Sequence, residues 1–299
     1  MKYSKPPLLF EKQVQLLENR GLVITNHKRA IHYLRNISYY RLRAYMMPFQ
    51  NPKDEEHLFR KCVSFDDILN LYIFDRELRL LLFDAIERIE IAIRTQIIYQ
   101  FSVEYGFDFY HKEELYRDVN IFDQTMKSLN SEIDRSHEIF LTHFKTKYSE
   151  EPNPPSIMAL EVSSFGTLSK LFRNLKMSKA KKLVSRQFGL HPYVLESWIQ
   201  STTYVRNIVA HHGRLWNRKL TTRPTLLEYV PKELVWISSN DIASNKIYAF
   251  LACIMYLKRV INPGTIFHTR LKDLIKKYSI IDINKMGFPE NWEKEDLWN

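Results

Sequence analysis

The chain has 299 residues, of which 45% are hydrophobic and 13% aromatic, which is enough for one large core or two smaller ones and excludes a disordered protein. Only seven glycines argue against folds that depend on many glycine turns, so we expect an all-α protein. The net charge of +10 is concentrated in residues 1–61 and 170–223, which suits a polyphosphate partner, although a solvated basic face would give the same pattern.

The first 61 residues are expected to form a basic helical region. No apolar run long enough for a signal peptide precedes Glu11, so export is not expected. The pattern predicts a helix over residues 10–20, closed by Gly21, and a second helix from about Asn26 to Tyr45. In this second helix aromatic and basic side chains alternate, an arrangement that can stack bases and clamp phosphates, although each tyrosine considered alone fits a core position better.

Residues 62–299 are expected to form a helical bundle with additional C-terminal helices. The segment 67–105 contains neither proline nor glycine and predicts the longest helix. Along it, Glu87, Glu90 and Arg94 are spaced at i, i+3 and i+7 and form a charged stripe. Such a stripe is usually a salt-bridged surface or a polar ladder between helices. The functional alternative is that one of its carboxylates orients a catalytic cation.

A polar helix is predicted over residues 118–148, before a proline-rich linker over 150–155 in which the chain must turn. A short helix around 157–162, a corner at 164–167 and a strongly basic helix ending near residue 188 should follow. We expect the basic segment 170–186 to guide a polyphosphate chain by its backbone rather than to read bases.

The helix from residue 193 to Gly213 carries the candidate chemistry. One apolar stripe runs along it, made of Val194, Leu195, Trp198, Ile199, Thr202, Val205 and Val209. His212 falls on this stripe, which predicts a core or boundary histidine. Asn207 and His211 share the opposite, polar face, where Asn207 can fix the imidazole tautomer, so His211 is the better acid or base. Arg206 projects about 140° away from His211, so the two meet only if the arginine reaches across, if the last turn is distorted, or if two subunits share the site.

The remaining sequence predicts helices over 244–260 and 269–278. No membrane association is expected, because the longest uncharged apolar run, 247–257, is shorter than the roughly 20 residues a bilayer requires. Cys62 and Cys253 lie far apart without CxxC spacing, so neither a disulfide framework nor a zinc site is indicated, and a reducing cytoplasm fits. No nucleotide-binding loop or nucleophile elbow is present, and the histidines lack metal-ligand spacing. We therefore expect no metal and no cofactor.

The stretch Arg206 to His211 matches the Arg-x4-His pattern of the HEPN superfamily of helical ribonucleases, which is weak evidence alone. A longer series of matching segments is more specific, and it comprises residues 13–49, 71–79, 86–94, 164–169 and 206–218. Over at least residues 10–220 the chain therefore resembles the Abi_2 family, the AbiD/AbiF-like abortive-infection proteins of bacteria, which are regarded as HEPN-type. Gly213 departs from the family pattern, at a position where a small polar residue is expected.

This resemblance implies a helical bundle of HEPN type with an N-terminal helical extension. It also implies a metal-independent endoribonuclease that acts as a homodimer, with one Arg-x4-His motif from each subunit facing a cleft. Arg206, Asn207 and His211 are then the catalytic residues. The supporting residues are expected to be His212, Arg214, Glu87, Glu90 and Arg94. The RNA-binding residues are expected to be Lys179, Lys181, Lys182, Arg186 and Arg218. A small-RNA antitoxin, proposed for AbiF-like members, is a further expected partner.

The implied chemistry is consistent with these residue types. RNA supplies its own nucleophile, the 2′-hydroxyl, so the protein must only move protons and stabilise the extra charge of the phosphorane. An imidazole, with an ordinary pKa near about 6.5, suits the first task, and a forked guanidinium suits the second. Two alternatives stay open: a non-catalytic RNA-binding or sensor protein in which Arg206 and His211 only grip phosphate, and a structural helix cap without chemistry. The leading hypothesis is a cytoplasmic HEPN ribonuclease that acts in phage defence or as a toxin.

Overall fold

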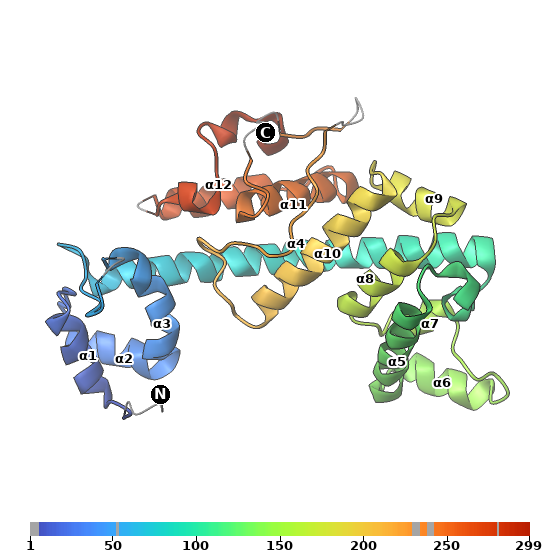
Figure 1. Ribbon diagram of the computed structural model, residues 1–299, viewed down its shortest axis with the longest axis horizontal. Helices are drawn as coiled ribbons and strands as arrows, with labels where there is room; N and C mark the ends of the chain where they lie inside the picture. Colours follow the sequence, from blue (N-terminus) through green and yellow to red (C-terminus); the bar gives the residue numbers. More distant parts are fainter. Residues whose placement is uncertain (1–5, 52–53, 229–233, 238–241, 280) are drawn as a thin grey trace. The chain divides into compact units, whose positions relative to one another are not determined.

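The computed structural model describes residues 6–51, 54–228, 234–237, 242–279 and 281–299. Twelve α-helices and six short 3-10 helices form the described part of the chain, and it contains no strand beyond three isolated bridges. The expected all-α fold is confirmed (Figure 1). Across the same ranges, no helix combines the length and the apolar character needed to span a bilayer.

The chain divides into two compact units. Unit 1 comprises residues 1–79 and 273–281, and unit 2 comprises residues 80–272 and 282–299. The first border falls inside α4 (Phe65–Tyr105), which has 41 residues and is the longest helix, as predicted. Unit 1 therefore includes the first turns of α4, whereas the sequence analysis placed a border at residue 61.

Unit 1 contains the helices α1 (Phe10–Asn19), α2 (His27–Ile37) and α3 (Tyr39–Met46). The end of α1 agrees with the prediction, since Gly21 has a positive φ of 87°. The single helix expected from Asn26 to Tyr45 is wrong, because Ser38, with φ 74° and ψ 146°, separates α2 from α3. The Ser38 hydroxyl accepts a hydrogen bond from the N–H of Arg41 and so caps the new helix.

A buried polar cluster fixes α3 to the first half of α4. The Tyr45 hydroxyl donates to Asp75 Oδ2 at 2.7 Å, and Arg79 Nη1 donates to Asp75 and, at 3.1 Å, to the Tyr45 oxygen. Burial, followed by the neighbouring Asp75 carboxylate, raises the pKa of Tyr45. Since Asp75 is fully buried and Arg79 nearly so, the cluster holds the end of α3 in a defined position.

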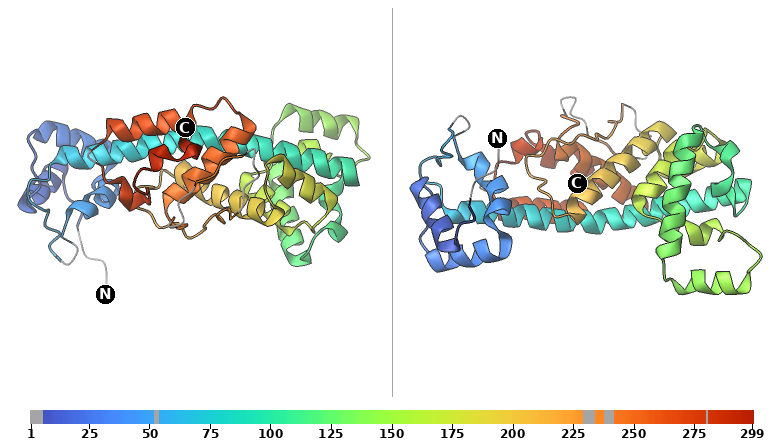
Figure 2. Two further views of the ribbon diagram at one scale, coloured as in Figure 1. Left: turned by 90° about the horizontal axis from the view of Figure 1, so that it is seen from above. Right: turned by 60° about the horizontal axis from the view of Figure 1, so that its bottom comes forward.

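Unit 2 contains the helices α5 (Val119–Arg135), α6 (Ile139–Lys147), α7 (Ser156–Ala159), α8 (Phe165–Asn174), α9 (Lys179–Gln187), α10 (Pro192–Ala210) and α11 (Ile247–Ile261). Helix α8 packs between α5 and α10, and α9 and α11 also contact α10 (Figures 1 and 2). The predicted burial of the apolar run in α11 is confirmed, because every residue from Ile247 to Lys258 is buried. Helix α12 (Phe267–Lys277) crosses the second border between the units.

Two predicted helices of unit 2 are each divided in the structure. The polar helix expected over residues 118–148 ends at Arg135, and Ser136 and Glu138 are extended before α6 begins. The basic helix is really α8 followed by α9, and the predicted corner at 164–167 is the start of α8. Ser164 and Ser178 cap these two helices by accepting hydrogen bonds from the backbone N–H groups of the first turns.

Candidate functional site

Helix α10 positions the candidate residues. Pro192 stands in its first turn, as expected, and the His191 side chain accepts a hydrogen bond from the N–H of Tyr193. The predicted apolar stripe is confirmed except at Val194, which is only half-buried. Its buried members are Leu195, Trp198, Ile199, Thr202, Val205 and Val209.

The end of α10 has two hydrogen bonds that reach back into the last turn. The N–H of Gly213 donates to the carbonyl of Ile208 at 2.7 Å, and the N–H of His212 donates to that of Val209 at 2.9 Å. This pair of bonds defines a Schellman motif, which needs a left-handed residue directly after the C-cap. His211 is the C-cap, and His212, with φ 56°, takes the left-handed conformation.

This geometry corrects two predictions. Gly213 was expected to close the helix, yet the left-handed residue is His212. A side chain at 213 would instead be closely packed, because a Cβ there would lie 3.0 Å from Ile208 Cγ2 and 3.2 Å from the Ile208 carbonyl oxygen. His212 was expected at a core or boundary position, but it is exposed, because the chain leaves the helical path before it.

The structure places the three predicted catalytic residues in the last turns of α10. Asn207 and His211 are exposed, and Arg206 is half-buried. Asn207 and His211 are four residues apart, and the N–H of His211 still donates to the Asn207 carbonyl at 3.0 Å, so both belong to one helical face. Arg206 projects about 140° away. No side-chain hydrogen bond or ion pair joins Arg206 to His211 within the described ranges, so a single chain does not bring them together.

Tyr204 is a residue of this face that the sequence analysis missed. It precedes His211 by seven residues, so the two side chains project in nearly the same direction. A hydrogen bond with the side chain of Thr221, followed by one with Arg218, lowers the pKa of Tyr204. The seven-residue spacing from His211 was the available signal.

The segment that follows α10 returns along the helix. The N–H of Thr225 donates to Ser197 Oγ at 2.9 Å, and the indole of Trp198 donates to the Thr225 carbonyl at 2.7 Å. Together with the bonds of Tyr204, these contacts hold residues 218–225 beside α10. The predicted RNA-binding residue Arg218 is thereby kept close to the candidate site.

The sequence stretch around the site carries positive charge only. Between Glu196 and Glu228 the sequence contains no carboxylate, and the half-buried Arg206, Arg214 and Arg218 fall in this interval. Arg218 Nη1 donates to the Arg214 carbonyl at 3.2 Å, which links the two arginines through the backbone. An anionic polymer would meet no repulsive side chain from this stretch.

Helix α9 presents a basic stripe, which we define as Lys179, Lys182 and Arg186. All three side chains are exposed, and their i, i+3 and i+7 spacing places them on one face. The fourth predicted residue, Lys181, is wrong as a surface contact, because it is fully buried.

Lys181 closes the C-terminal end of α8 instead. Its Nζ donates to the carbonyls of Phe172 at 2.7 Å and Leu175 at 2.6 Å, and it pairs with Glu196 Oε1 at 2.7 Å. Burial lowers the pKa of Lys181 to about 8, although the pairing with Glu196 opposes this effect. Arg117 Nη2 also forms an ion pair with Glu196 Oε1, at 3.0 Å. This network, which the sequence analysis missed, fixes α10 against α8 and α9.

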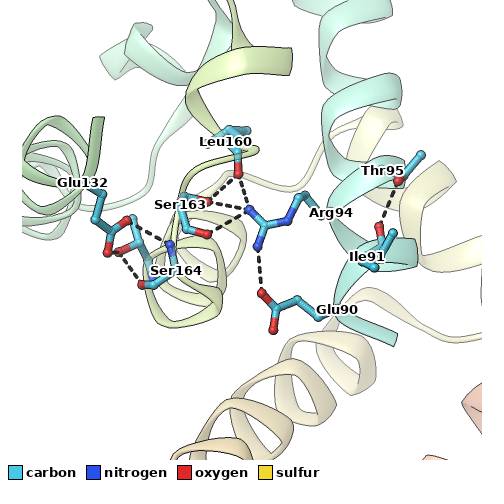
Figure 3. A network of polar contacts seen from close by, with 9 residues as sticks. Glu90, Ile91, Arg94, Thr95, Glu132, Leu160, Ser163 and Ser164 are labelled. Carbon is cyan, nitrogen blue, oxygen red and sulfur yellow. Dashed lines mark hydrogen bonds and ion pairs between the residues drawn. The ribbon is translucent and has the colours of Figure 1, made fainter. Parts of the chain in front are cut away.

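The charged stripe on α4 is divided between an ion pair, drawn in Figure 3, and an exposed residue. Arg94 is buried, pairs with Glu90 at 2.8 Å, and donates to the Leu160 carbonyl and to the carbonyl and hydroxyl oxygens of Ser163, the latter two at 2.9 Å. Glu87 is exposed and lies outside this network. Glu90 and Arg94 thus form the polar link between helices that was the commoner interpretation of the stripe.

The same corner is held from α5 by Glu132. Its carboxylate accepts hydrogen bonds from the Ser164 N–H and the Thr167 hydroxyl, both at 3.0 Å. Figure 3 shows Glu132 and Arg94 approaching the corner before α8 from different helices. Since α8 packs on α10, these contacts support the site indirectly.

No group of three or more His, Cys, Asp or Glu side chains could hold a metal ion among the residues that the structure describes. Both cysteines are free, with Cys62 exposed and Cys253 buried.

The model of a family described as Abi-like protein matches residues 32–217, well over half of the chain. The matched region includes the whole of α10, the Schellman motif and the stretch from Arg206 to His211. Comparison with curated proteins and with solved structures gives no significant match.

Proposed function

Because the chain belongs to the family of Abi-like proteins, we propose that it acts in abortive infection as a metal-independent endoribonuclease of HEPN type. The observation that carries this proposal is the exposure of His211 and Asn207 on one face at the end of α10, in a stretch without carboxylates. Such a surface accepts a phosphodiester and offers it an imidazole.

The proposed reaction is an intramolecular transesterification of RNA. A base removes the proton of the 2′-hydroxyl, whose oxygen attacks the adjacent phosphorus, and the bond to the 5′-oxygen breaks as an acid protonates that oxygen. The products are a 2′,3′-cyclic phosphate and a 5′-hydroxyl end. His211 moves the protons, Arg206 stabilises the charge on the phosphorane, and Asn207 orients the imidazole.

The geometry of α10 supports a site shared by two subunits. Arg206 and His211 diverge by about 140° on their own helix, whereas two copies of α10 that face each other can bring the arginine of one to the histidine of the other. Two imidazoles would also allow one to act as the base and the other as the acid. We therefore propose a homodimer as the active form.

The charge distribution supports RNA as a partner. The basic stripe on α9 attracts the RNA backbone and guides it to the site, and Arg214 and Arg218 add positive charge beside His211. A small-RNA antitoxin that occupies the same surfaces would hold such a toxin inactive, and we include it in the proposal as a second anionic partner.

The test is cleavage of a labelled RNA by the purified full-length chain in excess EDTA. The test variants are Arg206→Ala, Asn207→Ala and His211→Ala. The controls are Arg173→Ala on α8 and His143→Ala on α6, which remove an exposed arginine and an exposed histidine. We expect the loss of His211 to slow cleavage by roughly a hundredfold or more, with cyclic phosphate ends in the wild-type products. Both control variants should cut normally.

A mixing experiment tests the shared site. Arg206→Ala and His211→Ala, each inactive alone, should recover part of the cleavage after joint unfolding and refolding, because a mixed dimer regains one intact pair. If all proteins cut equally, His211 is not catalytic. If none cuts while all bind RNA equally, the chain is a non-catalytic RNA-binding protein.

A further inference from the structure

Unit 1 contains a cavity of about 520 Å³ that the nuclease proposal does not use. It lies between the segment before α1, the end of α1, the start of α3 and the loop at His57. Its described lining includes Arg20, Arg43 and His57 and contains no carboxylate. A volume of this size is typical of sites for small molecules, and the charge of its walls selects an anion.

The two arginines have donors to spare for a ligand. Arg20 Nη1 donates to the Tyr39 hydroxyl at 2.7 Å, and Arg43 Nη2 contacts His57 Nε2 at 3.2 Å. Each guanidinium carries five N–H donors, so one hydrogen bond leaves most of them able to bind a phosphate. The start of α3 opens at the same cavity and also favours negative charge.

An aromatic surface stands beside these cations. Tyr40 is 82% exposed although it lines the cavity, and Tyr39 is half-buried next to it. Leu8 and Leu16 provide an apolar wall. Exposed tyrosine rings next to arginines are suited to stack a base whose phosphate is held by the guanidinium groups.

The backbone around the cavity is strained at two places. Ser38 has φ 74° and ψ 146°, and His57 has φ 61°, and both residues line the cavity. Residues other than glycine rarely adopt such backbone conformations, and the strained residues that proteins do retain are concentrated at ligand sites. The Ser38 conformation starts α3 at Tyr39 and so places both tyrosines at the cavity.

From these observations we propose that unit 1 binds a nucleoside monophosphate, either as a free nucleotide or as the 5′-terminal nucleotide of an RNA. Arg20 and Arg43 hold the phosphate, and Tyr40 stacks on the base. The site is separate from His211 and does not depend on the nuclease proposal.

The test is a calorimetric titration of the full-length chain with AMP, adenosine and inorganic phosphate. We expect one saturable AMP site, with adenosine and phosphate each bound at least about tenfold more weakly. Arg43→Ala and Tyr40→Ala should each weaken AMP binding by about tenfold, and both side chains are exposed, so folding should be preserved. Arg35→Ala and Tyr99→Ala, exposed controls outside the cavity, should bind AMP like the wild type.

A competition experiment with the His211→Ala protein distinguishes a free nucleotide from an RNA end. If the nuclease proposal holds, this variant leaves the RNA competitor intact. Its AMP affinity should be normal whether or not the nuclease proposal holds. Displacement of AMP by a short RNA with a 5′-phosphate, and not by its 5′-hydroxyl form, identifies an RNA end as the ligand, whereas displacement by neither identifies a free nucleotide. The proposal is overturned if the wild type shows no saturable AMP binding. It is also overturned if the cavity variants bind AMP no more weakly than the two controls.

Discussion

Replacing Arg94 with alanine should destabilise unit 2 strongly. The Arg94 side chain is 8% exposed and that of its partner Glu90 is 19% exposed, so the substitution leaves a largely buried carboxylate without its cation. Removing one partner of a buried pair costs about 3–5 kcal/mol. Glu90 can regain some hydration, and Ser163 Oγ still donates to the Leu160 carbonyl at 2.7 Å, so we expect the lower end, about 3 kcal/mol.

Thermal unfolding followed by circular dichroism measures this loss. For a protein unit of this size, about 3 kcal/mol corresponds to a fall in Tm of roughly 6–12 °C. The control is Arg88→Ala, which removes an exposed arginine from the same helix and should change the stability by no more than about 0.5 kcal/mol. Equal melting of the two variants would refute the structural role of Arg94. Normal melting combined with lost RNA cleavage would assign it to catalysis instead.

Two further predictions concern lysine and arginine side chains of α9. Because the pKa of Lys181 is about 8 in the folded protein and 10.5 in the unfolded chain, the unfolded chain binds more protons between these values. The free energy of unfolding of the wild type should therefore rise from pH 8 to pH 10.5 relative to that of Lys181→Met, by up to about 1.4 kcal/mol per pH unit. Urea titrations at several pH values measure both free energies. Parallel plots of the two free energies against pH would contradict the prediction. The double variant Lys182→Glu, Arg186→Glu should bind RNA more weakly, and with a flatter salt dependence, than the control Lys147→Glu, which changes an exposed residue of α6. Unchanged RNA affinity at low salt would show that the basic stripe is only a solvated face.

The helices that the sequence predicted best are those with strong local signals. The long helix α4 was found because 41 residues pass without proline or glycine, and α10 because Pro192 opens it and its apolar residues repeat with helical period. The breaks between helices were missed where only a serine marks them. Ser38 ends one helix and caps the next through a positive φ that no sequence pattern demands.

Within the site, helical period was sufficient for some residues and failed for others. It placed Asn207 and His211 correctly on an exposed face, because Asn207 lies in the last turn and the N–H of the C-cap His211 still donates to its carbonyl. It failed for His212, because the helix ends before that residue. Charge counting failed for Lys181, since its burial depends on carbonyl groups at the end of a neighbouring helix that only the tertiary structure brings near.

The paths of α4 and α12 decide how this protein can be shortened or labelled. The chain passes between its two units at residues 79–80, 272–273 and 281–282, and the first two positions lie inside helices. A cut at either of these two would leave about four unpaired N–H or C=O groups at each new helix end, so neither unit is expected to survive alone. Protease cleavage and the insertion of a tag are better tolerated in irregular, exposed segments than inside helices. Residues 149–153, in the linker before α7, form such a segment.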